Sequence, residues 1–175
     1  MSKTRQIAIC SMMIALALAL SYMERFIPLQ MVIPLPGVKL GLANIVTLIA
    51  LYLLKTKHAF AILIPRCILG ALFGGGVTGL MFSLCGGMLA MCVMALTRRM
   101  SLFSVYGVSI LGAAAHNIGQ IGVAMLMLRS VYIGAYLPYL LVISIFTGFV
   151  TGGACAGVLR TLKYASISVP TEMSR

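Results

Sequence analysis

Long apolar runs separated by short polar or charged segments make up most of the chain. The runs cover approximately residues 6–23, 38–54, 59–73, 77–96, 103–128 and 139–159. A helix that crosses a lipid bilayer needs about 20 predominantly apolar residues. The pattern therefore predicts an all-α, polytopic membrane protein. We expect residues 1–175 to form a single domain, a bundle of six transmembrane helices.

Composition agrees with this prediction. Hydrophobic residues make up 62% of the chain and charged residues only 9%, whereas about a quarter of a soluble domain is charged. The net charge of +11 arises from 13 Lys and Arg against two acids, Glu24 and Glu172. In a membrane protein this excess indicates the positive-inside rule and contact with anionic membrane lipid, so no nucleic-acid partner is predicted.

The loop cations predict the orientation of the helices. One side of the predicted bundle carries Lys3, Arg5, Lys55, Lys57, Arg98, Arg99, Arg160, Lys163 and Arg175. The other side carries Arg25, Lys39 and Arg129, and Arg66 lies inside a span. Because cytoplasmic loops are enriched in Lys and Arg, both termini are predicted to be cytoplasmic.

A stiff turn precedes the second span. Pro34, Pro36 and Gly37 prevent a continuous helix there. Lys39 follows at once, and Asn44 lies early in the apolar run. A polar pair at the mouth of a membrane helix is typical of the rim of a binding pocket, so both residues are candidate ligand-binding residues.

Arg66 lies in the middle of the third span, about 10 Å from either end at 1.5 Å per residue. Burial of an arginine there costs at least about 2.5–3.5 kcal/mol on insertion scales, so it needs a partner or a wet cavity. One interpretation is a structural ion pair with Glu24. The other is a site for an anionic ligand, because Arg25, Lys39 and Arg66 outnumber Glu24 on the outer half.

A second polar cluster lies in the fifth span. His116, Asn117 and Gln120 share one helical face because they are three and four residues apart. They are either interhelical hydrogen-bonding groups or ligand-binding residues, with His116 as a possible proton acceptor. A metal site is disfavoured because no other His or carboxylate accompanies them in the span.

Small residues recur every four positions along the first span, at Ser11, Ala15 and Ala19. Such a face allows close approach of another helix in lipid. It serves either packing within the bundle or docking to a separate partner subunit.

Several functional classes are excluded by what the chain lacks. It has no aspartate and no Walker motif, so neither ATP hydrolysis nor the Asp-rich magnesium site of a prenyl diphosphate synthase is expected. The five cysteines are scattered without a CxxC pair and indicate buried packing. We therefore expect no enzyme activity, no cofactor and no metal.

The stretch from Pro34 to Ile45, PLPGVKLGLANI, and the stretch from Gly112 to Gln120, GAAAHNIGQ, resemble the Gx transporter family over nearly the whole chain. That family is often labelled heptaprenyl diphosphate synthase component I. It is similar in turn to the substrate-binding S components of energy-coupling factor (ECF) transporters, which are six-helix proteins that work with a transmembrane T subunit and two ATPases.

The resemblance implies a bacterial cell-membrane protein that binds a small solute such as a vitamin, a flavin or quinone precursor, or an isoprenoid precursor. It implies that Ser11, Ala15 and Ala19 dock on the T subunit, with serine at one position of an alanine-based motif. The pocket would open outward, lined from the loop after the first span and from the second, third and fifth spans, and the bundle would topple to release the solute.

Two other functions stay open from the sequence. The chain is alternatively a non-catalytic membrane partner in prenyl diphosphate, quinone or flavin-linked electron-transfer metabolism. A third possibility is a stand-alone channel or proton-coupled carrier, which would need His116 or Glu24 as a titrating group.

Overall fold

The computed structural model describes residues 3–26, 39 and 41–164 of the chain. Within those residues it contains helices and turns and no strand. Its elements are α1 (Lys3–Met23), η1 (Glu24–Phe26), α2 (Asn44–Leu53), α3 (Thr56–Gly70), η3 (Ala71–Gly75), α4 (Gly76–Arg98), α5 (Val105–Leu128), η4 (Val131–Tyr136) and α6 (Leu137–Tyr164). The all-helical prediction is therefore confirmed for the part described.

The predicted number of six membrane spans is not confirmed. Four stretches of the described chain are long and apolar enough to cross a membrane: Lys3–Met23, Thr56–Arg98, Val105–Leu128 and Val131–Tyr164. Helix α2 has ten residues, which at 1.5 Å per residue cover about half of a 30 Å hydrocarbon core. The sequence predicted a longer helix over 38–54, but Gly41 has φ +83° and delays the start of the helix.

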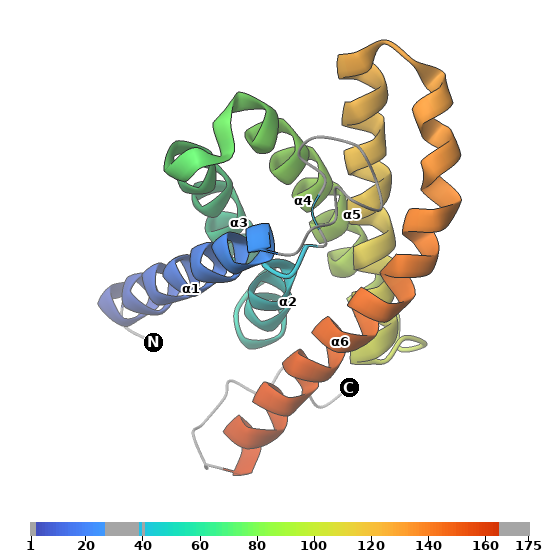
Figure 1. Ribbon diagram of the computed structural model, residues 1–175. Helices are drawn as coiled ribbons and strands as arrows, with labels where there is room; N and C mark the ends of the chain where they lie inside the picture. The colour runs from blue at the N-terminus through green and yellow to red at the C-terminus, as the bar shows by residue number, and fades with distance from the viewer. Residues whose placement is uncertain (1–2, 27–38, 40, 165–175) are drawn as a thin grey trace.

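The stretch Thr56–Arg98 is not a straight helix. Phe73 and Gly74 have non-helical backbone angles, with φ 100° at Gly74, and Gly76 has φ 61°. Glycine adopts this left-handed region without steric cost. The chain therefore turns back between α3 and α4 at three consecutive glycines, which separate the predicted apolar runs 59–73 and 77–96, as Figure 1 shows.

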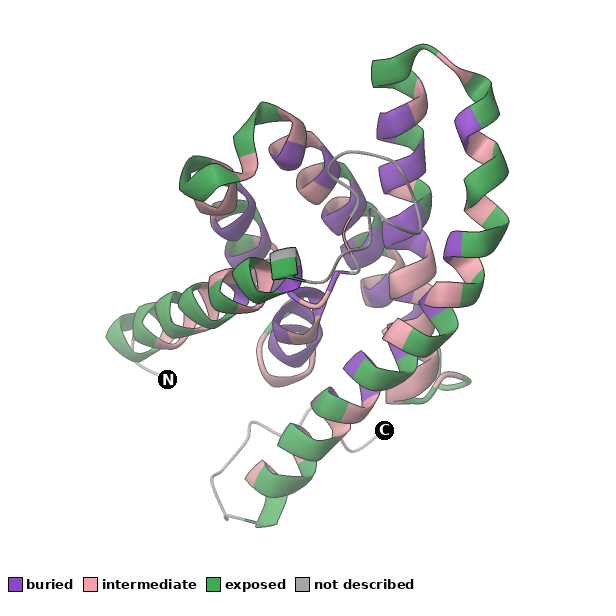
Figure 2. Ribbon diagram, in the orientation of Figure 1, coloured by how far each residue is buried: buried purple, intermediate pink, exposed green. Residues whose placement is uncertain are grey.

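Neighbours in sequence are neighbours in space for most of the fold. Helix α4 packs on α3 and α5, and α5 packs on α6, while α1 lies at the edge against α3 and α2. One apolar core lies among α2, α3 and α4 and includes Val108 of α5 and Cys155 of α6, and a smaller one lies where α4, α5, η4 and α6 meet. Exposed residues cover the outer sides of α1 and α6 in Figure 2, and many are large apolar side chains such as Met12, Leu16, Phe146 and Phe149. An apolar outer surface suits a protein that sits in lipid.

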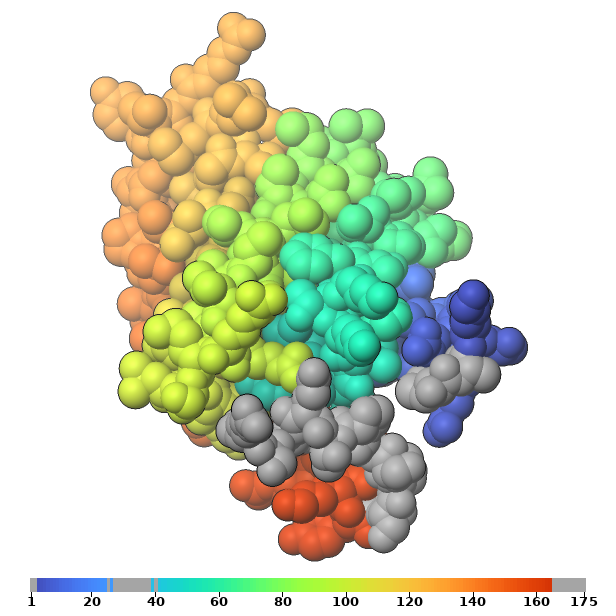
Figure 3. Space-filling model, turned by 180° about the vertical axis from the view of Figure 1, so that it is seen from behind, coloured from blue at the N-terminus to red at the C-terminus, as the bar shows by residue number. Residues whose placement is uncertain are grey.

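The turns that carry the predicted cytoplasmic cations lie together. Figure 3 shows the end of α2 and the start of α3 beside the end of α4, with the end of α6 on the same side of the molecule. The Arg98 guanidinium joins the end of α4 to the end of α2, since it donates to the Leu51 carbonyl and lies 5.0 Å from the centre of the Tyr52 ring. Three cationic segments of the sequence thus share one face of the fold, at the α2–α3 turn, at the end of α4 and at the end of α6.

Candidate functional site

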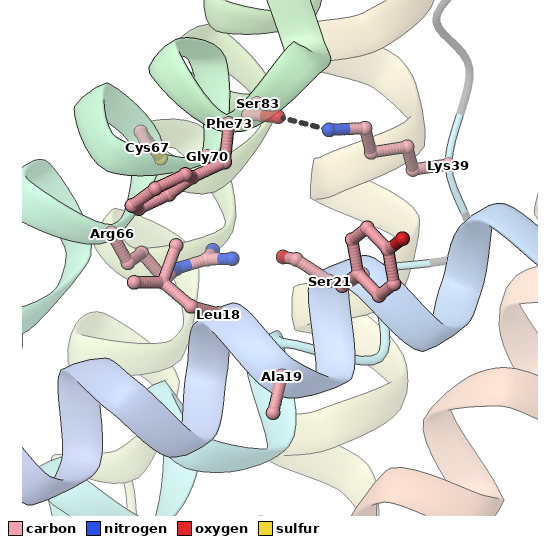
Figure 4. A pocket seen from close by; sticks show the side chains of 10 residues that line it. Leu18, Ala19, Ser21, Lys39, Arg66, Cys67, Gly70, Phe73 and Ser83 are labelled. Carbon is pink, nitrogen blue, oxygen red and sulfur yellow. Dashed lines mark hydrogen bonds between the residues drawn. The ribbon is translucent and has the colours of Figure 1, made fainter.

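A pocket of about 400 Å³ lies between α1 and the turn formed by α3, η3 and α4 (Figure 4). Residues from four elements and Lys39 line it: Leu18, Ala19, Ser21 and Tyr22 of α1, Arg66, Cys67 and Gly70 of α3, Phe73 of η3, and Ser83 of α4. The volume is in the range of small-molecule sites, about 300–1,000 Å³. The sequence predicted walls from the loop after the first span and from the second, third and fifth spans. In the structure, α3 and Lys39 of the predicted second span do line the pocket, but α1 and α4 replace the fifth span, and residues 27–38 of the loop lie outside the described residues.

Arg66 is the buried charge of this pocket, with a relative exposure of 6%. Its Nη2 donates to Asn44 Oδ1 at 3.0 Å, and its Nε has no hydrogen-bond partner among the described residues. The guanidinium points toward the hydroxyl of Ser21 in Figure 4. The absence of a side chain at Gly87 leaves space for the guanidinium, because a Cβ added there would lie 3.4 Å from Nη2. Arg66 is thus oriented by a neutral amide and retains a free donor.

Lys39 reaches the same pocket from the segment that precedes α2. Its Nζ donates to Ser83 Oγ at 3.0 Å, as the dashed line in Figure 4 marks. Its backbone N–H donates to Gln120 Oε1 at 3.2 Å. The lysine is therefore fixed at both ends, by α5 through its backbone and by α4 through its side chain.

Glu24 lies in η1, beyond the end of α1, and is buried. Its Oε1 accepts the Gly41 N–H at 2.5 Å, while Oε2 has no partner among the described residues. Arg66 donates to Asn44 and not to Glu24, so the structure does not contain the Arg66–Glu24 hydrogen-bonded pair that the sequence left open. Burial raises the pKa of the Glu24 carboxyl, against the opposing effects of the Gly41 N–H, Lys39 and Arg66.

His116 and Gln120 form a supporting layer behind Lys39. The two Nε2 atoms are 2.8 Å apart. Since Gln120 Oε1 accepts from Lys39, its Nε2 must donate, and His116 Nε2 must accept. The imidazole is packed tightly, because a Cβ at Gly41 or at Gly86 would approach it to within 3.1 or 2.9 Å. Neither His116 nor Gln120 lines the pocket.

Asn117 belongs to the packing of α5 on α6. Its Nδ2 donates to the Leu140 carbonyl at 3.1 Å and to Ser144 Oγ at 2.8 Å. Although the sequence placed Asn117 on the same face as His116 and Gln120, its described contacts join the two helices and do not reach the pocket.

Ser11, Ala15 and Ala19 all lie on an exposed face of α1. Ala19 also lines the pocket. These residues are therefore not buried by packing against the other described elements. Because Ala19 belongs to both, the edge of the pocket continues onto the outer face of α1.

Several pocket residues were not singled out from the sequence: Ser21, Tyr22, Cys67, Phe73 and Ser83. Small hydroxyls and aromatic rings occur throughout membrane helices, so their types alone carry no signal. Among the described residues, no group of three or more His, Cys, Asp or Glu side chains could hold a metal ion.

One comparison with known proteins confirms the family resemblance found in the sequence. A family model described as "Heptaprenyl diphosphate synthase component I" matches residues 13–158, which include both the segment before α2 and the polar cluster of α5. No curated protein and no solved structure matches the chain.

Proposed function

This chain belongs to the heptaprenyl diphosphate synthase component I family, and from that premise we propose that it is the substrate-binding membrane subunit of an uptake transporter of the ECF type. Its solute is a small anionic organic molecule, such as a vitamin or a flavin, quinone or isoprenoid precursor. The protein itself is not an enzyme.

The cationic pocket is the observation that carries this proposal. Lys39 and Arg66 both line it, and no acidic residue does so among the residues described. A buried charge is costly unless it is paired. Arg66 is hydrogen-bonded to the amide of Asn44 and no carboxylate lines the pocket, so an anionic ligand would supply the opposite charge.

The family name points toward diphosphate chemistry, but the residues favour binding over catalysis. The chain has no aspartate, and its two acids are Glu24 and Glu172. The described residues therefore contain a single carboxylate, that of Glu24, and offer no paired carboxylates for Mg²⁺ or for general acid and base catalysis.

Energy for uptake would come from partners. We propose a bundle of six membrane segments in the bacterial cytoplasmic membrane, with α2 as the short member and both termini in the cytoplasm. The exposed small-residue face of α1, with Ser11, Ala15 and Ala19, would dock on a T subunit that carries two ATPase subunits. Close approach of helices at small residues is the usual mode of association in lipid.

Purification of a tagged chain from its native membrane in a mild detergent tests the transport proposal. We expect a T subunit and two ATPase subunits to co-purify, and Ala15→Leu on the docking face to release them while Leu89→Ala, a change of an exposed residue of α4, does not. Co-purification of a prenyl diphosphate synthase subunit without ATPases would contradict the proposal.

That opposite result defines the second candidate function. The family name describes a component of a synthase, which favours a non-catalytic membrane partner in prenyl diphosphate, quinone or flavin-linked electron-transfer metabolism. Such a partner would retain its cellular role in a strain that lacks the ATPases, whereas an uptake subunit would lose it.

A further inference from the structure

The two ends of the pocket differ in chemistry. In Figure 4 the side chains of Leu18 and Phe73 lie on one side of the Arg66 guanidinium, and Ser21 and Lys39 lie on the other. Phe73 is 69% exposed and belongs to η3, where the chain turns between α3 and α4. The pocket therefore combines a cationic, hydroxyl-lined part with an apolar part.

From this asymmetry we infer that the ligand is an amphipathic anion, with one carboxylate or phosphate group bound by Arg66 and Lys39 and an apolar body against Leu18 and Phe73. The inference rests on the proposed function and narrows its substrate class. It also assigns Ser21 and Ser83 to the site as hydroxyl groups beside the anionic head.

The polar side of the pocket provides donors for oxygen acceptors. Arg66 Nε is buried and has no partner in the described chain, and a guanidinium matches the geometry of carboxylate and phosphate oxygens. Lys39 Nζ is held 3.0 Å from Ser83 Oγ, which keeps a second positive charge beside the first. Two cations held in place recognise an anionic head group.

The same residues reject a positively charged group. An ammonium on the ligand would need a carboxylate or several carbonyl acceptors, and the described lining has no acidic side chain. Glu24 is nearby in the fold but is not among the lining residues. Zwitterions such as amino acids are therefore excluded from the inferred ligand class.

Isothermal titration of the protein in phosphatidylcholine nanodiscs tests the ligand class with simple probes. We expect hexanoate or hexyl phosphate to bind at least tenfold more tightly than acetate or inorganic phosphate, because the short anions lack an apolar body. Hexylamine and 6-aminohexanoate should give no binding. If 6-aminohexanoate or hexanol binds as tightly as hexanoate, the inference is wrong.

Variants link this binding to the named residues. Arg66→Gln and Lys39→Gln should each weaken hexanoate binding at least tenfold, whereas the matched control Lys57→Gln removes an exposed cation of α3 and should leave it unchanged. Two independent pocket variants keep the test valid if one fails to fold. Equal affinity in all three variants would overturn the inference.

The source of the anion is resolved by repeating the titration in nanodiscs that contain phosphatidylglycerol. Weaker hexanoate binding there would mean that the anionic lipid competes for the site, and the natural occupant would then be a lipid head group. Unchanged binding would mean that the natural occupant is a free solute. The result is separable from the transport proposal, since hexanoate can bind in the absence of ATPase partners, and ATPases can co-purify with a protein that prefers zwitterions.

Discussion

Arg66 is the residue on which the binding site depends. It is almost completely buried, and its hydrogen bond goes to the neutral side chain of Asn44. A guanidinium in this position has lost water without gaining a hydrogen-bonded carboxylate, which is costly unless a ligand provides one. The charge is therefore better explained by binding than by stability.

Asn44 acts on the ligand through Arg66, as a positioning residue. A hydrogen bond to a charged group contributes about 1.5–3 kcal/mol, so Asn44→Ala is expected to weaken hexanoate binding by about 10–100-fold. The matched control is Asn117→Ala, a buried asparagine whose contacts join α5 to α6. The control should lower the thermal stability and leave the affinity unchanged. Calorimetry measures the affinity for hexanoate, and circular dichroism measures the thermal stability. Equal loss of affinity in both variants would contradict a positioning role for Asn44 and indicate a general effect of destabilisation.

Glu24 is expected to oppose anion binding. Burial raises the pKa of its carboxyl above the ordinary 4.5, so the folded protein holds this proton more tightly than the unfolded chain does. The resulting stabilisation is fully present below pH 4.5 and is lost as the pH rises through the raised pKa.

Glu24→Gln removes the charge and keeps an oxygen for the Gly41 N–H. It should therefore flatten the dependence of unfolding temperature on pH and, at neutral pH, tighten hexanoate binding by about two- to tenfold, as expected from removal of one nearby negative charge. Weaker binding in this variant would mean that Glu24 contacts the ligand as an acceptor.

At the scale of single residues, the sequence predicts the charged residues of the site better than the neutral ones. Arg66 and Lys39 stand out because a cation in or beside an apolar run needs an explanation. The helical spacing places His116 and Gln120 on one face, but it cannot tell that they support Lys39 and do not line the pocket. Ser21 and Phe73 give no signal, since only the tertiary structure brings α1 to the turn after α3.

At the scale of elements, the length of α2 is the feature that hydropathy overestimates. The run over 38–54 is apolar throughout most of its length, yet the helix begins at Asn44. Hydropathy measures the preference of side chains for lipid and does not detect a left-handed residue such as Gly41, whose conformation places a non-helical segment beside the pocket. That segment is what carries Lys39 to Ser83.

Close helix packing is a further property of the elements, and α6 offers a matched test of it. A Cβ at Gly148 would lie 2.5 Å from Ile110 Cα in α5, whereas one at Gly157 meets nothing within 4 Å. Gly148→Ala is therefore expected to destabilise the bundle by about 1–3 kcal/mol, while Gly157→Ala, in the same helix, is neutral or slightly stabilising. Unfolding in a denaturing detergent measures both, and equal effects would contradict the packing described here.

At the scale of the whole molecule, the grouping of cationic turns predicts the orientation in the membrane. The turns after α2 and α4 and the end of α6 lie on one side of the fold, and they carry Lys55, Lys57, Arg98, Arg99 and Arg160. By the positive-inside rule this side faces the cytoplasm.

Reporter fusions measure the orientation directly. Alkaline phosphatase fused after Ser130, between α5 and α6, should be active because it lies outside, and green fluorescent protein fused after Tyr164 should fluoresce because it lies in the cytoplasm. The reverse pattern would invert the topology and place the pocket on the opposite side of the membrane.

The most direct test of the cationic pocket is native mass spectrometry of the protein released from its own membrane in a mild detergent. We predict that the wild-type protein and Lys57→Gln carry the same small-molecule mass increment, that the released molecule is an acid with an apolar body, and that Arg66→Gln lacks it. An increment that persists unchanged in Arg66→Gln, or a released molecule without an acidic group, would contradict the account.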